Sequence, residues 1–118
     1  MTKKISYITL VIFSAVLAVC SCSKSSGSKP PNTFSGASVN IQNFAFFPDT
    51  IRIKAGSTVR WTNMDGMPHT ATSLTSIFNS GSIAPGSAFD FTFATAGTYT
   101  YHCTIHDSMK PGVVIVSN

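Results

Sequence analysis

The stretch TIRIKAGSTVRWTN, residues 50–63, alternates apolar and polar side chains on both sides of a glycine. Ile51 and Ile53 share one face before that glycine, and Val59 and Trp61 share one face after it. Alternation with a period of two, carried by β-branched and aromatic residues, is typical of a strand with one buried face. The stretch therefore predicts two strands that are joined at the glycine.

The same alternation continues in both directions from this stretch. SVNIQNF places Val39 and Ile41 on one face, and FDFTF places its three phenylalanines on one face. TYTYHC places Cys103 on the same face as its two tyrosines. GVVIVS is a continuous apolar run, which suits a buried last strand. We expect no helix, and at most one short turn in LTSIFNSG. Short strands separated by turn signals indicate an all-β sandwich.

Residues 1–22 are predicted to be an export signal and not part of the sandwich. Two lysines precede an apolar run that ends at Val19 and is too short for a comfortable membrane span. A cysteine directly after such a run resembles a bacterial lipoprotein processing site, where that cysteine receives the lipid anchor. We favour Cys22, which follows a small residue, with Cys20 as the alternative. An ordinary cleaved signal with two incidental cysteines is the other interpretation.

Residues 23–36 are rich in Ser, Pro and Gly and are predicted to be a flexible linker before a domain at residues 37–118. The protein is thus expected to be exported and lipid-anchored in a bacterial cell envelope. The formal net charge of +4 includes two lysines of the predicted signal, and no basic cluster lies on an aromatic platform, which argues against nucleic acid. Cys103 is then the only cysteine of the domain, and an unpaired thiol outside the cell invites oxidation unless something occupies it.

Soft metal-binding side chains gather in CTIHDSM, residues 103–109. A thiol, an imidazole and a thioether stand at Cys103, His106 and Met109, with two residues between each pair. His69 follows GMP in another predicted loop, whereas His102 lies on the opposite strand face from Cys103 and is expected to point outward. One cysteine, two histidines and a more distant methionine are the donor set of a blue-copper site.

Other chemistries fit this set of donors less well. Closed zinc sites prefer more thiolates and rarely use methionine. A binuclear copper site would need a second cysteine nearby, and the domain has none. Nucleophilic catalysis by Cys103 beside a histidine would leave Met109 unexplained.

Three longer stretches resemble the cupredoxins, and most closely the amicyanin- and plastocyanin-like group. They are VNIQNFAFFPDTIRIKAGSTVRWTN, DGMPHTAT and FNSGSIAPGSAFDFTFATAGTYTYHCTIHDSM, and the resemblance covers essentially all of residues 37–116. It implies a Greek-key β-sandwich of about seven to eight strands. It also implies that one copper ion, cycling between Cu(II) and Cu(I), is bound by His69, Cys103, His106 and Met109.

The resemblance further implies supporting residues around the copper. Asn63 and Thr70 are expected to brace the ligand loops, and the carbonyl of Pro68 is expected near the metal on the side opposite Met109. Thr70 stands where the family usually has Asn, so its shorter hydroxyl is expected to bridge the loops less firmly.

A partner-docking rim is implied around the second histidine. It would consist of Met67, Pro68 and Ile105, with Asp107 adding a negative charge. His106 is then the expected exit for the electron.

The function implied is one-electron transfer between a donor and an acceptor protein by a monomer that transforms no substrate itself. The alternative is an envelope copper-binding or delivery protein without a redox partner. A domain of a multicopper enzyme would need further histidine clusters, and the chain has three histidines in all.

Overall fold

The structure of the protein is a computed structural model that describes residues 36–118. The predicted signal at residues 1–22, the two candidate lipidation sites Cys20 and Cys22, and all but the last residue of the predicted linker lie outside the described residues. The boundaries proposed for these segments therefore stay predictions. Among residues 36–118 no helix is long and apolar enough to cross a membrane.

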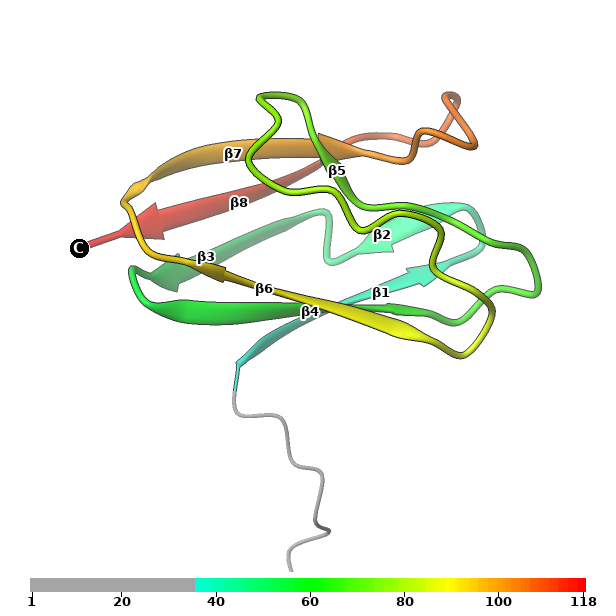
Figure 1. The fold of residues 1–118 in the computed structure, drawn as a ribbon, viewed down its shortest axis with the longest axis horizontal. Coiled ribbons are helices and arrows are strands. Elements are labelled where there is room, and N and C mark those ends of the chain that lie inside the picture. The colour runs from blue at the N-terminus through cyan, green and yellow to red at the C-terminus, as the bar shows by residue number, and fades with distance from the viewer. Residues whose placement is uncertain (1–35) are drawn as a thin grey trace, which may run out of the picture. The chain divides into compact units, whose positions relative to one another are not determined.

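Eight strands and no helix make up the described part of the chain (Figure 1). The strands are β1 (Ala37–Gln42), β2 (Ala45–Phe47), β3 (Thr50–Lys54), β4 (Ser57–Asn63), β5 (Thr72–Ser73), β6 (Ala88–Phe93), β7 (Gly97–His102) and β8 (Gly112–Ser117). They form two four-stranded sheets in the orders β2-β1-β4-β6 and β3-β8-β7-β5. The prediction of an all-β sandwich of about seven to eight strands is confirmed.

Both sheets are mixed. β1 pairs in parallel with β4, and β3 pairs in parallel with β8, while the other neighbours are antiparallel. The continuous apolar run of β8 agrees with its place between β3 and β7, because a strand inside a sheet can bury both faces. Val114 and Val116 are buried, and Val113 and Ile115 on the opposite face are half-buried.

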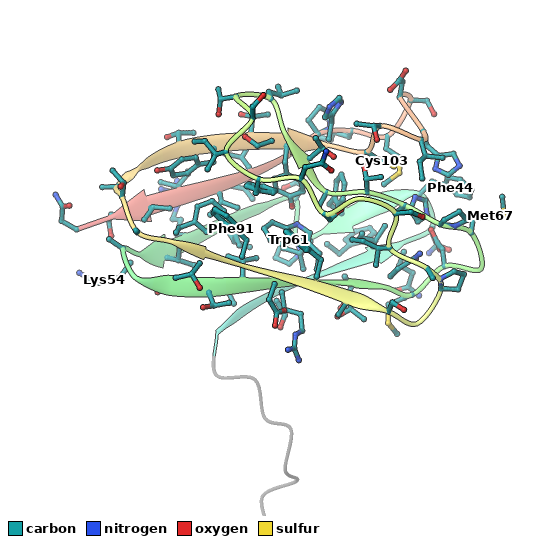
Figure 2. The ribbon with its side chains drawn as sticks, viewed as in Figure 1. Phe44, Lys54, Trp61, Met67, Phe91 and Cys103 are labelled. Carbon is teal, nitrogen blue, oxygen red and sulfur yellow. The ribbon has the colours of Figure 1, made fainter. Side chains whose placement is uncertain are left out.

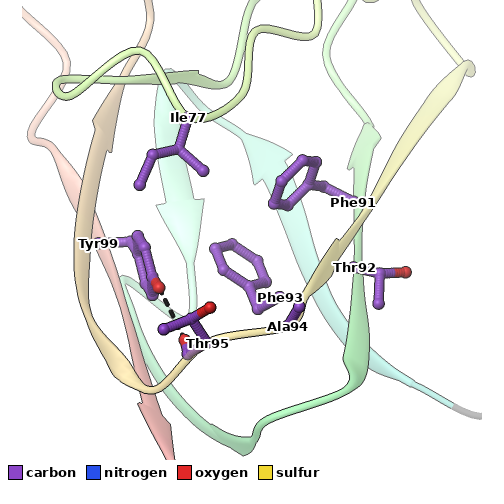
Figure 3. Close-up of a pocket in the computed structure, with 7 residues that line it drawn as sticks. All are labelled: Ile77, Phe91, Thr92, Phe93, Ala94, Thr95 and Tyr99. Carbon is purple, nitrogen blue, oxygen red and sulfur yellow. Dashed lines mark hydrogen bonds between the residues drawn. The ribbon is translucent and has the colours of Figure 1, made fainter.

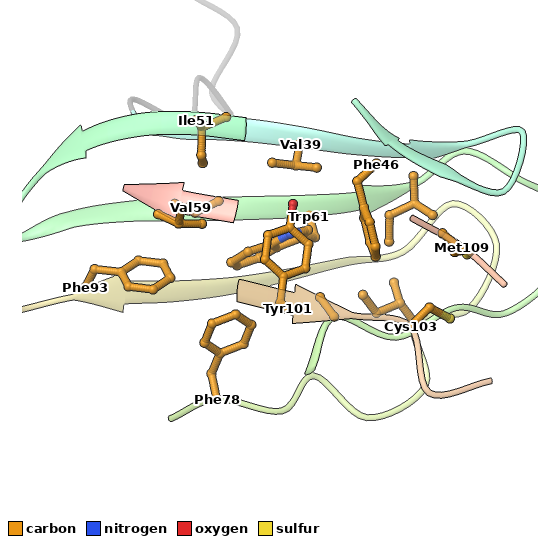
Figure 4. Packing of buried hydrophobic residues seen from close by; sticks show 14 of the residues in the cluster. Val39, Phe46, Ile51, Val59, Trp61, Phe78, Phe93, Tyr101, Cys103 and Met109 are labelled. Carbon is orange, nitrogen blue, oxygen red and sulfur yellow. The ribbon is translucent and has the colours of Figure 1, made fainter. Parts of the chain in front are cut away.

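The core between the sheets is built around Trp61, which is fully buried (Figure 4). The Tyr101 ring meets it edge-on at 5.3 Å between centroids, and Phe78 lies tilted against it at 5.2 Å. Aromatic rings gain from such edge-on and offset contacts in addition to their burial. Burial also raises the pKa of Tyr101 to about 12, so its hydroxyl stays protonated in the working range of the protein.

A hollow of about 370 Å³ lies near the start of β7 (Figure 3). It is lined by Ile77, Phe91, Thr92, Phe93, Ala94, Thr95 and Tyr99. On one side of the hollow the Tyr99 hydroxyl donates a hydrogen bond of 2.7 Å to the carbonyl of Thr95. Because Cys103 follows the other end of β7, this hollow and the predicted metal site are separated by the length of that strand.

Three connections meet at the opposite end of the sandwich. They are the turn between β1 and β2, the loop after β4 and the loop after β7, drawn in cyan, green and orange in Figure 1. The second carries His69 and the third carries His106 and Met109. The sheet topology therefore brings the two predicted ligand loops together.

Candidate metal centre

Three of the predicted ligands converge on one point. Cys103 Sγ lies 3.7 Å from His69 Nδ1 and 3.8 Å from His106 Nδ1, and the two Nδ1 atoms are 3.2 Å apart. His69 comes from the loop after β4, and the other two residues come from the segment after β7. This cluster is the one group of three or more potential metal ligands from His, Cys, Asp and Glu in residues 36–118.

The triangle of donor atoms has the size that a metal ion requires. A point equidistant from three atoms at these separations lies about 2.1 Å from each of them. Metal–imidazole bonds are about 2.0–2.1 Å long and metal–thiolate bonds about 2.3 Å. The residues present therefore fit a trigonally bound ion of the kind that a Cys–His–His set selects.

The three donors differ in their access to solvent. His69 and Cys103 are completely buried, whereas His106 is half-buried. Among the described residues no hydrogen bond reaches His106 Nε2, while His69 Nε2 is hydrogen-bonded to Asp65. His106 is thus the donor of the cluster that lies nearest to solvent.

Thr70 joins the two ligand loops. Its backbone N–H donates to Cys103 Sγ at 3.3 Å, and its hydroxyl oxygen accepts the backbone N–H of Thr104 at 2.8 Å. The hydroxyls of Thr70 and Thr104 also lie 3.1 Å apart. The hydroxyl of Thr70 thus spans the two ligand loops directly.

Asn63 braces the His69 loop from the core side. This buried side chain donates to the carbonyls of Met67 and Ile83, at 2.7 and 2.9 Å, and accepts the backbone N–H of Asp65 at 2.9 Å. The His69 backbone pairs with Ile83 in both directions. All hydrogen-bonding groups of the Asn63 amide are used to fix the loop.

Met109 and Pro68 are the remaining residues predicted beside the metal. Met109 is buried within the hydrophobic core, and its backbone N–H donates to the carbonyl of His106 at 3.0 Å, which closes a tight turn between them. Pro68 is half-buried directly before His69. The axial role of the Met109 thioether and the placement of the Pro68 carbonyl opposite it stay predictions.

Asp65 was not predicted from the sequence, yet it contacts His69 directly. One of its carboxylate oxygens lies 2.8 Å from His69 Nε2. The carboxylate also accepts the backbone N–H groups of Asn43 and Phe44 at 2.6 and 3.0 Å. The Phe44 N–H is the main cause that lowers the pKa of Asp65, with Asn43 and His69 acting in the same direction and burial opposing them.

Phe44 is the second residue that sequence reasoning missed. Its ring stands edge-on to both imidazoles, at 5.3 Å from His69 and 5.0 Å from His106 between centroids. A carboxylate four residues before the ligand His69 was a visible signal for Asp65. Phe44 had no such signal, because only the turn between β1 and β2 brings it to the site.

Exposed apolar side chains surround this end of the molecule (Figure 2). Phe44, Met67 and Ile105 are each about half exposed, at 48%, 51% and 46%, and Asp107 is exposed beside His106. The residues predicted to form a docking rim are therefore on the surface. Their use in docking stays a prediction.

Comparisons with known proteins agree with this geometry. The sequence-family model of the cupredoxin-like domain matches residues 10–116 of this chain. The chain therefore belongs to the cupredoxin-like family. The chain is 32% identical over 82 residues to amicyanin from Paracoccus denitrificans, a match that covers 65% of this chain and 63% of that protein. It is 38% identical over 72 residues to plastocyanin from Scenedesmus fuscus, covering 52% of this chain and 74% of that protein. The match thus spans less than two thirds of the length of that amicyanin.

Solved structures give the same result for the fold. The Cu(I) form of an amicyanin variant superposes with a TM-score of 0.68 at 28% identity, covering 74% of this chain and 87% of that one. A purple cupredoxin from Nitrosopumilus maritimus superposes with a TM-score of 0.64 at 32% identity, covering 69% of this chain and 99% of that one.

Proposed function

We propose that this protein is a type 1 (blue) copper electron carrier. The observation that carries the proposal is the triangle formed by Cys103 Sγ and the Nδ1 atoms of His69 and His106, which has the size of a trigonal metal site. Membership of the cupredoxin-like family, similarity to amicyanin and plastocyanin, and a structural neighbour solved in its Cu(I) form support copper as the metal.

Each residue has a distinct part in holding one copper ion. Cys103 would supply a thiolate, His69 and His106 two imidazoles, and Met109 a weakly binding thioether. Copper held in this way supplies reversible one-electron chemistry between Cu(II) and Cu(I). The buried side chains keep water away, and the hydrogen bonds of Asn63 and Thr70 keep the donors in place, so little rearrangement accompanies a change of charge.

Electron exchange is proposed at the edge formed by His106. The half-exposed Met67 and Ile105 and the exposed Asp107 would contact redox donor and acceptor proteins there. We infer that the protein acts as a monomer and transforms no substrate itself. The partners are defined only as one-electron donors and acceptors with a complementary apolar face.

We also propose that the protein is lipid-anchored at a bacterial cell envelope. The support is the sequence of residues 1–22, with Cys22 as the anchor and Cys20 as the alternative. Labelling cells with a radioactive fatty acid would test this. Loss of the label from Cys22→Ser but not from Cys20→Ser is expected, and an unlabelled wild-type protein would exclude the anchor.

Titration of the metal-free domain with Cu(II) tests the proposed function. The wild type is expected to develop an intense blue absorption at one equivalent of Cu(II), because thiolate-to-copper charge transfer requires Cys103. Cys103→Ser should lack this band. His106→Gln should lose or alter it, whereas the matched variant His102→Gln should keep it, since His102 lies outside the donor triangle.

The alternative outcome has its own signature. A wild-type protein that binds Cu(II) only as a pale or weak complex would contradict the electron-carrier proposal. It would favour the alternative of a copper-binding or delivery protein without a redox partner.

A further inference from the structure

Asp65 lies where the turn between β1 and β2 meets the loop that carries His69. Its carboxylate is shared among three contacts, to the backbone N–H groups of Asn43 and Phe44 and to His69 Nε2. Its side chain is only 12% exposed. One side chain therefore connects two segments that lie more than twenty residues apart in the sequence.

The contact with His69 determines which of its ring nitrogens carries the proton. An ionised carboxylate can only accept hydrogen bonds, so His69 Nε2 must donate to Asp65. In a neutral imidazole the other nitrogen, Nδ1, then presents its lone pair. That lone pair belongs to the atom that faces Cys103 Sγ and His106 Nδ1, so the tautomer is the one that a metal requires.

The contacts with the turn stabilise an unfavourable backbone. Asn43 and Phe44 have φ angles of 54° and 56°, which lie in the left-handed region. A two-residue hairpin turn of type I′ has positive φ at both positions and usually contains Asn or Gly there. Phenylalanine is disfavoured in it, because its Cβ crowds the backbone. The backbone N–H groups of Asn43 and Phe44 both donate hydrogen bonds to the Asp65 carboxylate, and these bonds offset the strain of the turn.

The turn at Asn43 and Phe44 also positions the Phe44 ring, which contacts both imidazoles. Phe44 contacts His69 and His106 edge-on, with interplanar angles of 84° and 86°. No hydrogen bond to His106 Nε2 is present in the described part of the chain. The Phe44 ring is therefore a contact that restrains the more exposed of the two imidazoles.

We propose that Asp65 is a positioning residue of the metal centre, which fixes His69 as the Nε2–H tautomer and holds the turn at Asn43 and Phe44 so that the Phe44 ring restrains both imidazoles. This inference rests on the proposed function, since it takes the imidazoles as metal ligands. Asp65 itself makes no contact with the point where the metal would sit.

The tautomer can be observed without any metal. Long-range ¹H–¹⁵N correlation spectra of the metal-free protein at mildly alkaline pH distinguish Nε2–H from Nδ1–H in each histidine. We expect His69 to be Nε2–H in the wild type and in Asp65→Glu, which keeps an acceptor-only group. In Asp65→Asn we expect a mixture or the Nδ1–H form. Wild-type His69 as Nδ1–H would overturn the inference.

Copper binding gives the second readout. Asp65→Asn is expected to bind Cu(II) about 10- to 100-fold more weakly than the wild type and to show altered visible and EPR spectra, as for other outer-sphere partners of histidine ligands. Asp65→Glu should recover most of the affinity. Asp90→Asn is the matched control, because its ion pair with Arg60 lies on β4 and β6 and makes no contact with the donor triangle.

The two proposals fail in distinguishable ways. A blue wild-type protein whose affinity and spectra are unchanged in Asp65→Asn would overturn the positioning role and leave the electron carrier intact. A wild type without a blue band would overturn the proposed function, while the NMR measurement would still decide the tautomer. If Asp65→Asn fails to fold, the tautomer of His69 and the copper affinity are compared between the wild type and Asp65→Glu instead.

Discussion

Thr70 shows how one small side chain can connect two ligand loops. Its N–H points at the thiol and its hydroxyl receives an N–H from the residue after that thiol. Both contacts come from a residue next to His69, so any movement of one loop is transmitted to the other. A hydroxyl suffices here because the segments approach closely.

Removal of the Thr70 hydroxyl should therefore loosen the centre. Thr70→Val keeps the shape but leaves the Thr104 N–H without its acceptor, so we expect the metal-free protein to lose about 1–3 kcal/mol of stability. Thr70→Ser keeps the hydroxyl and should lose less. Urea denaturation of both variants measures the difference. Equal stabilities for Val and Ser would show that the hydroxyl bridge contributes nothing.

The donors and the bracing residues Asn63 and Thr70 were predicted at this scale, whereas the contacts of Asp65 and Phe44 with the imidazoles were not. Cys103 and His106 stand in one short motif, and in the structure they lie beside His69. Asp65 and Phe44 act through a turn whose left-handed residues, Asn and Phe, lack the Asn-Gly signature of such hairpins. Local sequence therefore gave no reason to place that turn against the imidazoles.

At the scale of elements, β7 and β8 pack with unusual closeness. Tyr101 and Gly112 are direct cross-strand partners, and the Tyr101 ring lies over the glycine. A methyl group at position 112 would overlap the ring and hydroxyl of Tyr101. Glycine is thus needed on β8 for a reason of space, and the ring that it accommodates belongs to the core beside Trp61.

Gly112→Ala should consequently destabilise the sandwich. Overpacking of a core typically costs about 1–3 kcal/mol, and we expect a loss at or above that range because the strands fix the ring. Gly66→Ala is the control, since an added methyl meets nothing within 4 Å there. Chemical denaturation compares the two. A Gly112→Ala protein as stable as Gly66→Ala would mean that Tyr101 moves aside freely.

Alternation predicted the longer strands and missed the short ones. β2 and β5 have three and two residues, which is too few for a period of two to be visible. β5 exists because Thr72 and Ser73 pair with the end of β7. The parallel pairing of β1 with β4 was also outside local reasoning, because alternation does not specify the direction of a partner strand.

For the whole molecule, the metal centre sits on a core that is complete without it. His69 and Cys103 are buried and held by Asp65 and Thr70 through protein contacts alone. The core runs from Val39 to Val116 across both sheets. We therefore expect the domain to fold without a metal, in contrast to small zinc modules.

Removal of copper should thus leave a folded protein with a lower melting temperature. A ligand that binds only the native state at 100 times its Kd adds about 2.7 kcal/mol, and each kcal/mol shifts Tm by about 4–8 °C in a domain of this size. Calorimetry and circular dichroism of metal-free and Cu(II)-loaded protein check this. A metal-free chain without a cooperative transition would contradict it.

The parallel strand pairs also have a kinetic consequence. The parallel partner of β1 is β4, which follows β2 and β3 in the chain, and the parallel partner of β3 is β8, the last strand. Contacts between such distant segments require large loops to close before any pairing is gained, which places folding in the slow range for small domains, about milliseconds to seconds. The donors of the centre are separated in the same way, by 34 residues between His69 and Cys103. The complete set of donors therefore exists only once the two ligand loops have met, so we expect the folded chain to be the form that binds copper as a blue site.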